Sequence, residues 1–157
     1  EAQSIRGLAQ YTEEIRERFV NLAISYNINI ITGSMPLLKE DGALYNVGYL
    51  IRRDGSYEMY EKVHVTPDEQ KSWGLSGGKM VKTFDTDCAR IGVLICYDVE
   101  FPELSRIMAD QGMQILFVPY GYAERLLSGS CMCPSPGDRE RVLRGDSGQR
   151  GQPASCA

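Results

Sequence analysis

The 157-residue sequence lacks any apolar run near the roughly 18 residues of a membrane-spanning helix. Its longest apolar stretch, 91–96, has the length of a buried strand. The sequence also has no excess of basic over acidic residues, because its net charge is −4. Nucleic acids and anionic membranes attract basic proteins. We therefore expect neither as a partner, and the length suits one domain with a real core.

The cysteines show no disulfide framework, because their number is odd and their spacing irregular. They are Cys88, Cys96, Cys131, Cys133 and Cys156. A reducing, cytoplasmic setting is the simplest interpretation. The Cys131-x-Cys133 pair has no matching second pair, so we expect no metal site and no cofactor. The first residue is Glu1 and no signal-like segment follows, which indicates a processed chain or a fragment.

The order of the hydrophobic patterns predicts an α/β fold. Apolar residues recur at helical spacing from Tyr11 to Tyr26, with Thr12 as a candidate cap and Asn27 or Asn29 as a candidate end. Asp54-Gly55 indicates a hairpin. Strands are expected at 28–32, 44–51, 57–65, 81–84, 91–96 and 114–118. A second helix is expected at 102–112. The strand–helix–strand order over 90–118 predicts a βαβ unit in a mixed sheet with helices on its outer face.

The composition changes after Tyr122. Residues 128–157 are rich in Gly, Ser, Pro and Arg and have almost no apolar periodicity. Such a segment is typical of disorder. We therefore divide the chain into a domain at 1–122 and a tail at 123–157.

Cys96 stands where a buried strand gives way to a helix. Ligands gather at the carboxyl ends of strands in α/β sheets, and helix N-terminal amides activate a thiol and bind an oxyanion. Position alone also fits a small buried hydrophobe, which is the common role of a free cysteine.

The segments around Cys96 and Lys62 resemble the nucleophile and lysine motifs of the nitrilase superfamily of carbon–nitrogen hydrolases. They read ICYDVEFPEL at 95–104 and YEKVHVTPDE at 60–69. Further similar stretches lie at 26–34, 44–46 and 73–85, so the resemblance covers about 1–120. It is greatest to the branch that often follows an N-terminal GNAT-type acetyltransferase domain.

This resemblance implies the α-β-β-α sandwich of the superfamily, an α/β fold, in truncated form. It implies that the Cys96 thiolate attacks an amide or nitrile carbon and forms a thioester, which water hydrolyses. Lys62 and the backbone N–H of Tyr97 would stabilise the oxyanion, and Glu69 would position substrate and lysine. Amides are the commoner substrates in the family. A small-molecule substrate, no cofactor and a homo-oligomeric parent are implied.

Other polar residues near these motifs have more than one interpretation. His64, the only histidine, could form a Cys–His dyad, but the family does not use it as a base. Asp98 and Glu103 are expected to orient the turn and cap the helix rather than react. Without the motif, Lys62 would be a solvated strand lysine and Glu69 a charged loop residue.

The family's general-base glutamate belongs ahead of the first helix, where this sequence has no matching motif. Glu1, Glu13 and Glu14 lie in the wrong context to replace it. The resemblance therefore predicts a site without its base, an absent opening strand, and a chain that is inactive as it stands.

The tail departs from the family after Val118-Pro119-Tyr120. Allowed codons read one base forward, from the boundary of Met132 and Cys133 to Gln152, yield CAQARAIENECYVAIAGNVGN, which resembles the family's continuation. We hypothesise a frameshifted translation from about Arg125 onward; a natural disordered tail is the alternative. Resequencing the DNA decides between them.

Three rival functions remain open from the sequence. One is a non-catalytic fragment or pseudoenzyme that only folds or associates. Another is an acyltransferase, because a thioester can pass to an amine as well as to water. The last is part of a fusion whose main role is acetyl transfer by another domain.

Overall fold

A computed structural model describes residues 2–121 and 141–143. Its elements, in chain order, are α1 (Ala2–Ala9), α2 (Thr12–Tyr26), β1 (Ile30–Ile31), β2 (Met35–Leu38), β3 (Leu44–Ile51), β4 (Tyr57–Glu61), the π-helix η1 (Glu69–Trp73), β5 (Leu75–Ser76), β6 (Thr83–Asp85), β7 (Arg90–Val93), the 3-10 helix η2 (Cys96–Glu100), α3 (Pro102–Asp110), β8 (Ile115–Phe117) and β9 (Arg141–Leu143).

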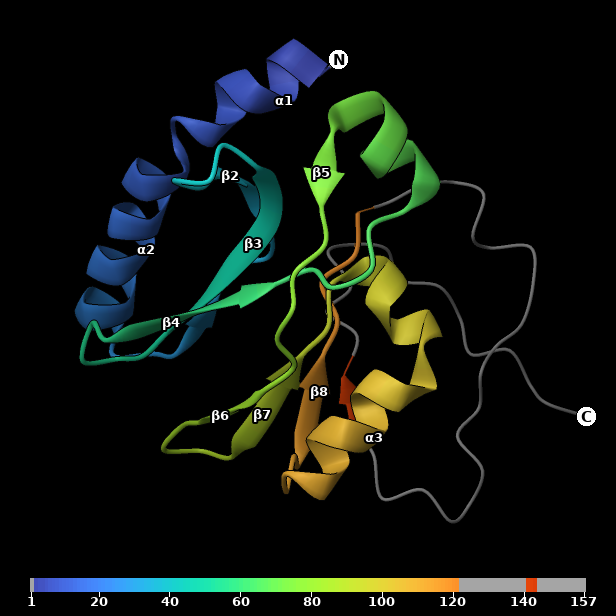
Figure 1. The fold of residues 1–157 in the computed structure, drawn as a ribbon. Coiled ribbons are helices and arrows are strands. Elements are labelled where there is room, and N and C mark those ends of the chain that lie inside the picture. The colour runs from blue at the N-terminus through green and yellow to red at the C-terminus, as the bar shows by residue number, and fades with distance from the viewer. Residues whose placement is uncertain (1, 122–140, 144–157) are drawn as a thin grey trace, which may run out of the picture.

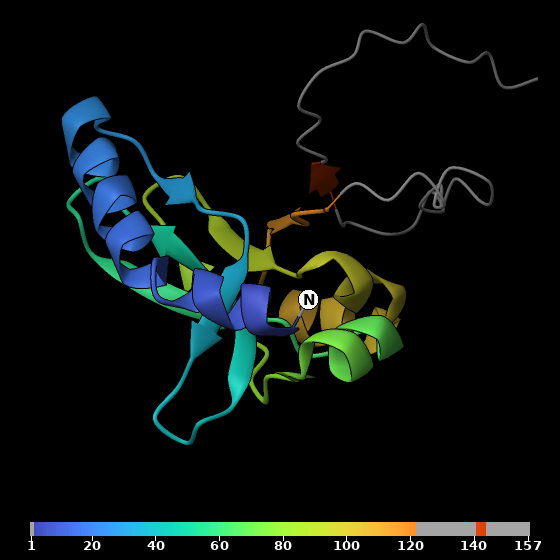
Figure 2. The ribbon, with the colours of Figure 1, turned by 90° about the horizontal axis from the view of Figure 1, so that it is seen from above.

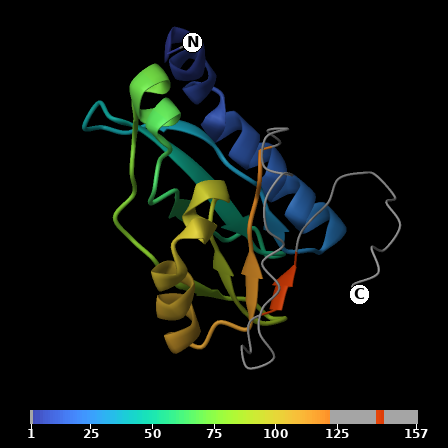
Figure 3. The same cartoon turned by 90° about the vertical axis from the view of Figure 1, so that its right-hand side faces the viewer.

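The strands form two sheets that pack face to face between helices (Figure 1). In the first sheet, β3 pairs antiparallel with β1, β2 and β4, and parallel with β5. In the second, β6 pairs antiparallel with β7, and β7, β8 and β9 run parallel. Helix α2 covers the outer face of the first sheet and α3 that of the second, as Figure 3 also shows. The layers are therefore α-β-β-α, and the predicted α/β sandwich is confirmed.

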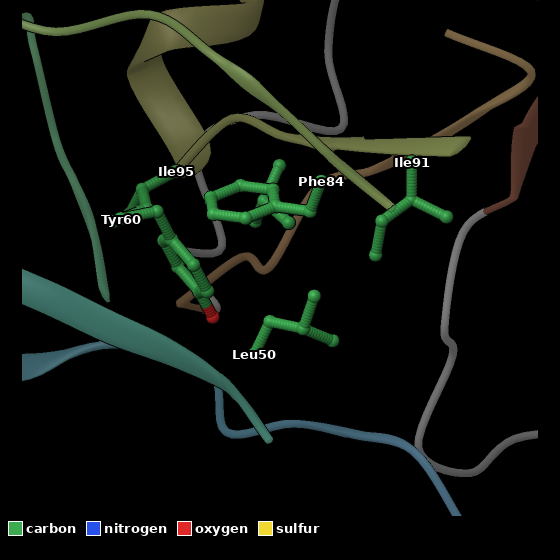
Figure 4. Packing of buried hydrophobic residues seen from close by; sticks show 6 residues of the cluster. Leu50, Tyr60, Phe84, Ile91 and Ile95 are labelled. Atoms are coloured by element: carbon green, nitrogen blue, oxygen red, sulfur yellow. The ribbon is translucent and has the colours of Figure 1, made fainter. Parts of the chain in front are cut away.

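The central core lies between the two sheets (Figure 4). Leu50 and Tyr60 of the first sheet pack against Phe84, Ile91 and Ile95, on or next to strands of the second. The sheets are stacked as expected for strands with an apolar inner face. This core fixes the ends of β4 and β7, the strands that lead into the predicted site.

Helix α2 follows its sequence pattern at one end and departs from it at the other. Asn27 ends the helix in the left-handed conformation, at φ 54°, as predicted. Thr12 was expected to cap the first turn, and this is wrong. Its hydroxyl instead donates to the carbonyl of Pro36 on β2, at 2.5 Å. The helix is thereby tied to an edge strand.

Several predicted strands are shorter in the structure, and several short elements, η1, β5 and η2 among them, were not predicted. Strand β3 has its predicted bounds, but β4 ends at Glu61 and β7 at Val93, each before the expected end. Helix α1, which lies beside η1 (Figure 2), and strand β2 were both missed. Apart from β9, the predicted tail at 123–157 and its cysteines lie outside the described residues.

No helix among residues 2–121 is long and apolar enough to cross a membrane.

Candidate active site

Lys62 directly follows β4, and its main chain is fixed on both sides. Its N–H donates to the carbonyl of Asn46 on β3 at 2.9 Å, and its carbonyl accepts from the N–H of Gly78 at 2.7 Å. A Cβ on Gly78 would come within 2.6 Å of the Glu61 side chain and 3.2 Å of the Lys62 carbonyl. Glycine is therefore needed where the 77–82 segment packs on the lysine backbone.

The Lys62 ammonium lies buried against the carboxylate of Glu69. Nζ is 2.7 Å from Oε1 and 2.6 Å from Oε2. The two side chains are only 2% and 11% exposed. A buried ammonium requires such a partner, because desolvation of an isolated charge is very unfavourable. These two predicted site residues are thus brought into direct contact.

Glu69 is itself held by the chain before it. Its Oε2 accepts from the N–H of Thr66 at 2.7 Å, and its own N–H donates to the Thr66 hydroxyl at 3.2 Å. This reciprocal arrangement is that of a capping box at a helix start. It holds the carboxylate still while both of its oxygens face the lysine.

Cys96 begins η2 in a left-handed backbone conformation, at φ 48°. Such a conformation is unfavourable for a residue other than glycine, and strained residues of this kind cluster at functional sites. The Cys96 N–H donates to the carbonyl of Pro119 at 3.0 Å, just beyond the ladder between β7 and β8. The turn therefore presents a half-buried thiol at the carboxyl ends of two parallel strands.

Tyr97 follows the thiol-bearing residue. No described residue accepts a hydrogen bond from its backbone N–H. Its ring meets that of Phe101 edge to face, with centroids 5.3 Å apart. The N–H next to Cys96 therefore has no competing partner in residues 2–121.

His64 contacts Asp98 and Phe101. Its Nδ1 lies 3.3 Å from Oδ1 of Asp98, and its ring stacks on Phe101 with centroids 3.6 Å apart. No hydrogen bond joins it to Cys96 among the described residues, so a Cys–His dyad is not formed here. The side chain of Glu103, in the first turn of α3, makes no capping hydrogen bond.

Asp98 orients the turn after Cys96, as expected, because its carboxylate accepts the N–H of Ile95 at 3.3 Å. Sequence reasoning missed its contacts with the Lys62 segment. This carboxylate is 1% exposed and accepts N–H groups from residues just after Lys62 and just before Cys96. An acidic residue two positions after Cys96, at the start of the strand-to-helix turn, was the available signal. Its partners, 34 and 35 residues earlier in the chain, were not readable from local sequence.

A cavity of about 290 Å³ lies behind this region. Val63 and Leu94 line it together with methionines of β4, the 77–82 segment and α3. None of Lys62, Glu69 and Cys96 does, so it is not the space in front of the thiol. Among the described residues, no group of three or more His, Cys, Asp and Glu side chains could hold a metal ion.

Known proteins resemble this chain in sequence and in fold. The family model described as "Carbon-nitrogen hydrolase" matches residues 2–141. "Probable hydrolase YhcX" of Bacillus subtilis (strain 168) is 48% identical over 122 residues, which are 78% of this chain and 24% of that protein. "Omega-amidase NIT2" of Homo sapiens is 37% identical over 123 residues, which are 70% of this chain and 44% of that protein.

Solved structures of carbon–nitrogen hydrolases also resemble this chain in fold. In a mutant of the amidase from Nesterenkonia sp. AN1, acrylamide has undergone Michael addition at the active-site cysteine. That structure is 26% identical, with a TM-score of 0.62, and covers 71% of this chain and 44% of that one. The chain thus spans less than half the length of these relatives. It belongs to the carbon–nitrogen hydrolase family, the nitrilase superfamily.

Proposed function

We propose that this chain carries the nucleophile and the oxyanion-stabilising groups of an amidase. The Cys96 thiolate attacks the carbonyl carbon of a small-molecule amide, the C–N bond breaks, and the protonated amine leaves. Water then cleaves the thioester to release the acid and restore the thiol. The observation that carries the proposal is the buried Lys62 ammonium, held by Glu69 and followed directly by residues joined to the Cys96 turn.

The lysine and one backbone amide are the proposed oxyanion donors. An ammonium has three N–H donors, and two contacts of Nζ go to Glu69. The remaining donor is left for a developing oxyanion, as is the N–H of Tyr97, which has no acceptor among residues 2–121. Each such donor contributes roughly 100- to 1,000-fold to the rate in other hydrolases. Glu69 holds the lysine side chain in place.

The activities of the relatives support an amide rather than a nitrile. One relative is an omega-amidase and another an amidase whose active-site cysteine adds acrylamide. Amide and nitrile substrates would meet the same cysteine and lysine, so a nitrile is the second candidate. We propose neither metal nor cofactor for the reaction.

Slow turnover by the 157-residue chain is part of the proposal. Within residues 2–121, no carboxylate hydrogen-bonds the Cys96 thiol. The first step uses the sulfur of Cys96 as the nucleophile, but hydrolysis of the thioester needs a base beside the attacking water. We therefore expect acylation of Cys96 to outpace release. A homo-oligomeric parent and an acetyltransferase fusion are proposals from the sequence resemblance, and a cytoplasmic setting is a proposal from the cysteine pattern.

Acrylamide tests the nucleophile and its lysine together. Its vinyl carbon bonds to Sγ, and a proton adds to the carbon beside the amide carbonyl. Peptide mass spectrometry gives the modification rates of Cys96 and of exposed Cys88 in the same chain. We expect Cys96 to react faster than Cys88, and Lys62→Met to lower the Cys96/Cys88 ratio about 10-fold.

The rival functions predict other outcomes. A pseudoenzyme predicts equal rates at both cysteines and no effect of Lys62→Met, which would contradict the proposal. If the chain is an acyltransferase, the Cys96/Cys88 rate ratio is the same as for an amidase. The acyl group on Cys96 then passes to an added amine faster than to water. The DNA upstream of this sequence decides the acetyltransferase fusion.

A further inference from the structure

Asp98 is a buried carboxylate whose partners are mostly main-chain N–H groups. Oδ2 accepts from the N–H of Ile95 at 3.3 Å and of Val63 at 3.2 Å. Oδ1 accepts from the N–H of His64 at 2.7 Å and lies 3.3 Å from its Nδ1. No Lys or Arg of residues 2–121 pairs with Asp98. A buried carboxylate without a cation is stable only where several donors meet it.

These donors follow strands of two different sheets. Val63 and His64 directly follow Lys62 and β4, in the first sheet. Ile95 directly precedes Cys96 and continues β7, in the second. The carboxylate therefore joins the segment that follows β4 to the segment that follows β7, next to Lys62 and Cys96.

A stacked pair of rings strengthens this junction. His64 lies flat on Phe101, with the two rings only 10° from parallel. Phe101 links η2 to α3 and is the residue on which the turn after Cys96 ends. His64 thus contacts the turn after Cys96 twice, through Asp98 and through Phe101, and makes no hydrogen bond with the thiol among the described residues.

We infer that Asp98 is a positioning residue, which holds the Lys62 segment against the Cys96 turn and so sets the lysine at the distance that activates the thiol. This inference rests on the proposed function. Asparagine cannot replace the carboxylate, because it has a single acceptor oxygen and its NH₂ group would face N–H donors. Asp98→Asn thus leaves buried N–H groups unpaired and releases one segment from the other.

The acrylamide assay separates positioning from simple stabilisation. We compare the Cys96/Cys88 rate ratio in the unmodified chain, Asp98→Asn, Lys62→Met and the double variant. Asp98→Asn is expected to lower the ratio about 10-fold, since a displacement of about 1 Å can change a rate by up to 100-fold. On the Lys62→Met background it should lower the ratio less than about 2-fold, because the lysine is already gone.

The control is Asp54→Asn in the β3–β4 hairpin. Asp54 also accepts two hydrogen bonds, both from Ser56, but lies in an exposed turn. Its substitution should leave the ratio unchanged. Equal effects of Asp98→Asn on both backgrounds, or no effect on either, would overturn the positioning role. An unchanged ratio in Lys62→Met contradicts the proposed function itself, whereas a fall there with no fall in Asp98→Asn contradicts only the inference.

A second measurement needs no substitution of Asp98, in case Asp98→Asn does not fold. The chain has one histidine, so the imidazole NMR signals all belong to His64. If the junction joins His64 to the Cys96 turn, modification of Cys96 by acrylamide shifts these signals. Unshifted signals after complete modification of Cys96 would overturn the inference.

Discussion

Replacement of Glu69 by Gln leaves the Lys62 ammonium buried without its counter-charge. The lysine side chain is 2% exposed, and both carboxylate oxygens contact its Nζ within 2.7 Å. Breaking a buried pair from one side lowers the free energy of unfolding by about 3–5 kcal/mol. Because Glu69→Gln keeps one acceptor oxygen for the lysine and Thr66, we expect the lower end, about 3 kcal/mol.

Removal of both charges should be less harmful than removal of the acid alone. In Lys62→Met/Glu69→Gln, an apolar chain of similar length meets a neutral amide, so no charge is left unpaired. We expect this double variant to be more stable than Glu69→Gln by about 1–2 kcal/mol. The second substitution thus restores stability that the first removed.

Urea unfolding measures these free energies, followed by far-UV circular dichroism and by the fluorescence of Trp73. Trp73 is the only tryptophan and lies in η1, the element that begins with Glu69. Coincident transitions by both probes justify a two-state analysis. If Glu69→Gln does not fold, the double variant still does, and that difference is itself the predicted result.

Glu14→Gln is the matched control on the surface. Glu14 pairs with Arg18 at 2.6 Å, with side chains 57% and 75% exposed, so its loss should change stability by less than about 0.5 kcal/mol. Our reasoning is refuted if Glu69→Gln lowers the free energy of unfolding no more than Glu14→Gln does. It is also refuted if the effects of Lys62→Met and Glu69→Gln on the free energy of unfolding are simply additive.

Other substitutions test the packing and the strained turn. Gly48→Ala should destabilise by more than about 3 kcal/mol, because its Cβ would meet the backbone carbonyl of Gly33 and the ring of Tyr60. Gly92→Ala should lower stability by only about 1–2 kcal/mol, since methionine sulfurs can move away; chemical denaturation compares the two. Cys96→Gly should be about 1 kcal/mol more stable than Cys96→Ala in the same assay, because only glycine relieves the φ of 48°. Burial raises the pKa of Tyr60 above its usual 10.0, so stability is complete below pH 10 and falls as the pH rises further. A pH series with Tyr60→Phe should show less of this alkaline loss; an equal loss would contradict it.

The sequence predicted elements whose signals are local. Strand β3 was found with its bounds because its run of apolar and aromatic residues ends at a hairpin signal, Asp54-Gly55. Asn27 was a candidate helix end because asparagine tolerates the left-handed conformation. The parallel pairing of β7 with β8 followed from the helix between them.

The missed features depend on tertiary contacts. Strand β2 contains Pro36 and was not predicted, because proline is tolerated only at the edge of a sheet, and β2 pairs with β3 on one side only. Thr12 found a partner on β2 instead of its own helix. Lys62 was expected inside a strand, yet β4 ends one residue earlier and the side chain becomes buried against Glu69.

In the site, too, the sequence predicted the residues that belong to local motifs but not the contacts between distant segments. Motif resemblance supplied Cys96, Lys62, Glu69 and Tyr97 as candidates, each from a few neighbouring letters. The contact between Lys62 and Glu69 spans seven residues, and its geometry needed the π-helix that places Glu69. The contacts of Asp98 with Val63 and His64 span 35 and 34 residues, so no local pattern contained them.

Direct detection of the acyl-cysteine is the sharpest test of the proposed chemistry. The chain is mixed with p-nitrophenyl acetate near neutral pH, quenched in acid, and its cysteine peptides are analysed by mass spectrometry. We predict acetyl transfer to Cys96 ahead of the other four cysteines, with release of p-nitrophenolate, and a strong decrease in Lys62→Met. Acetylation spread equally over all five cysteines, or a Cys96 yield unchanged by Lys62→Met, would contradict the assignment of Cys96 and Lys62 as nucleophile and partner.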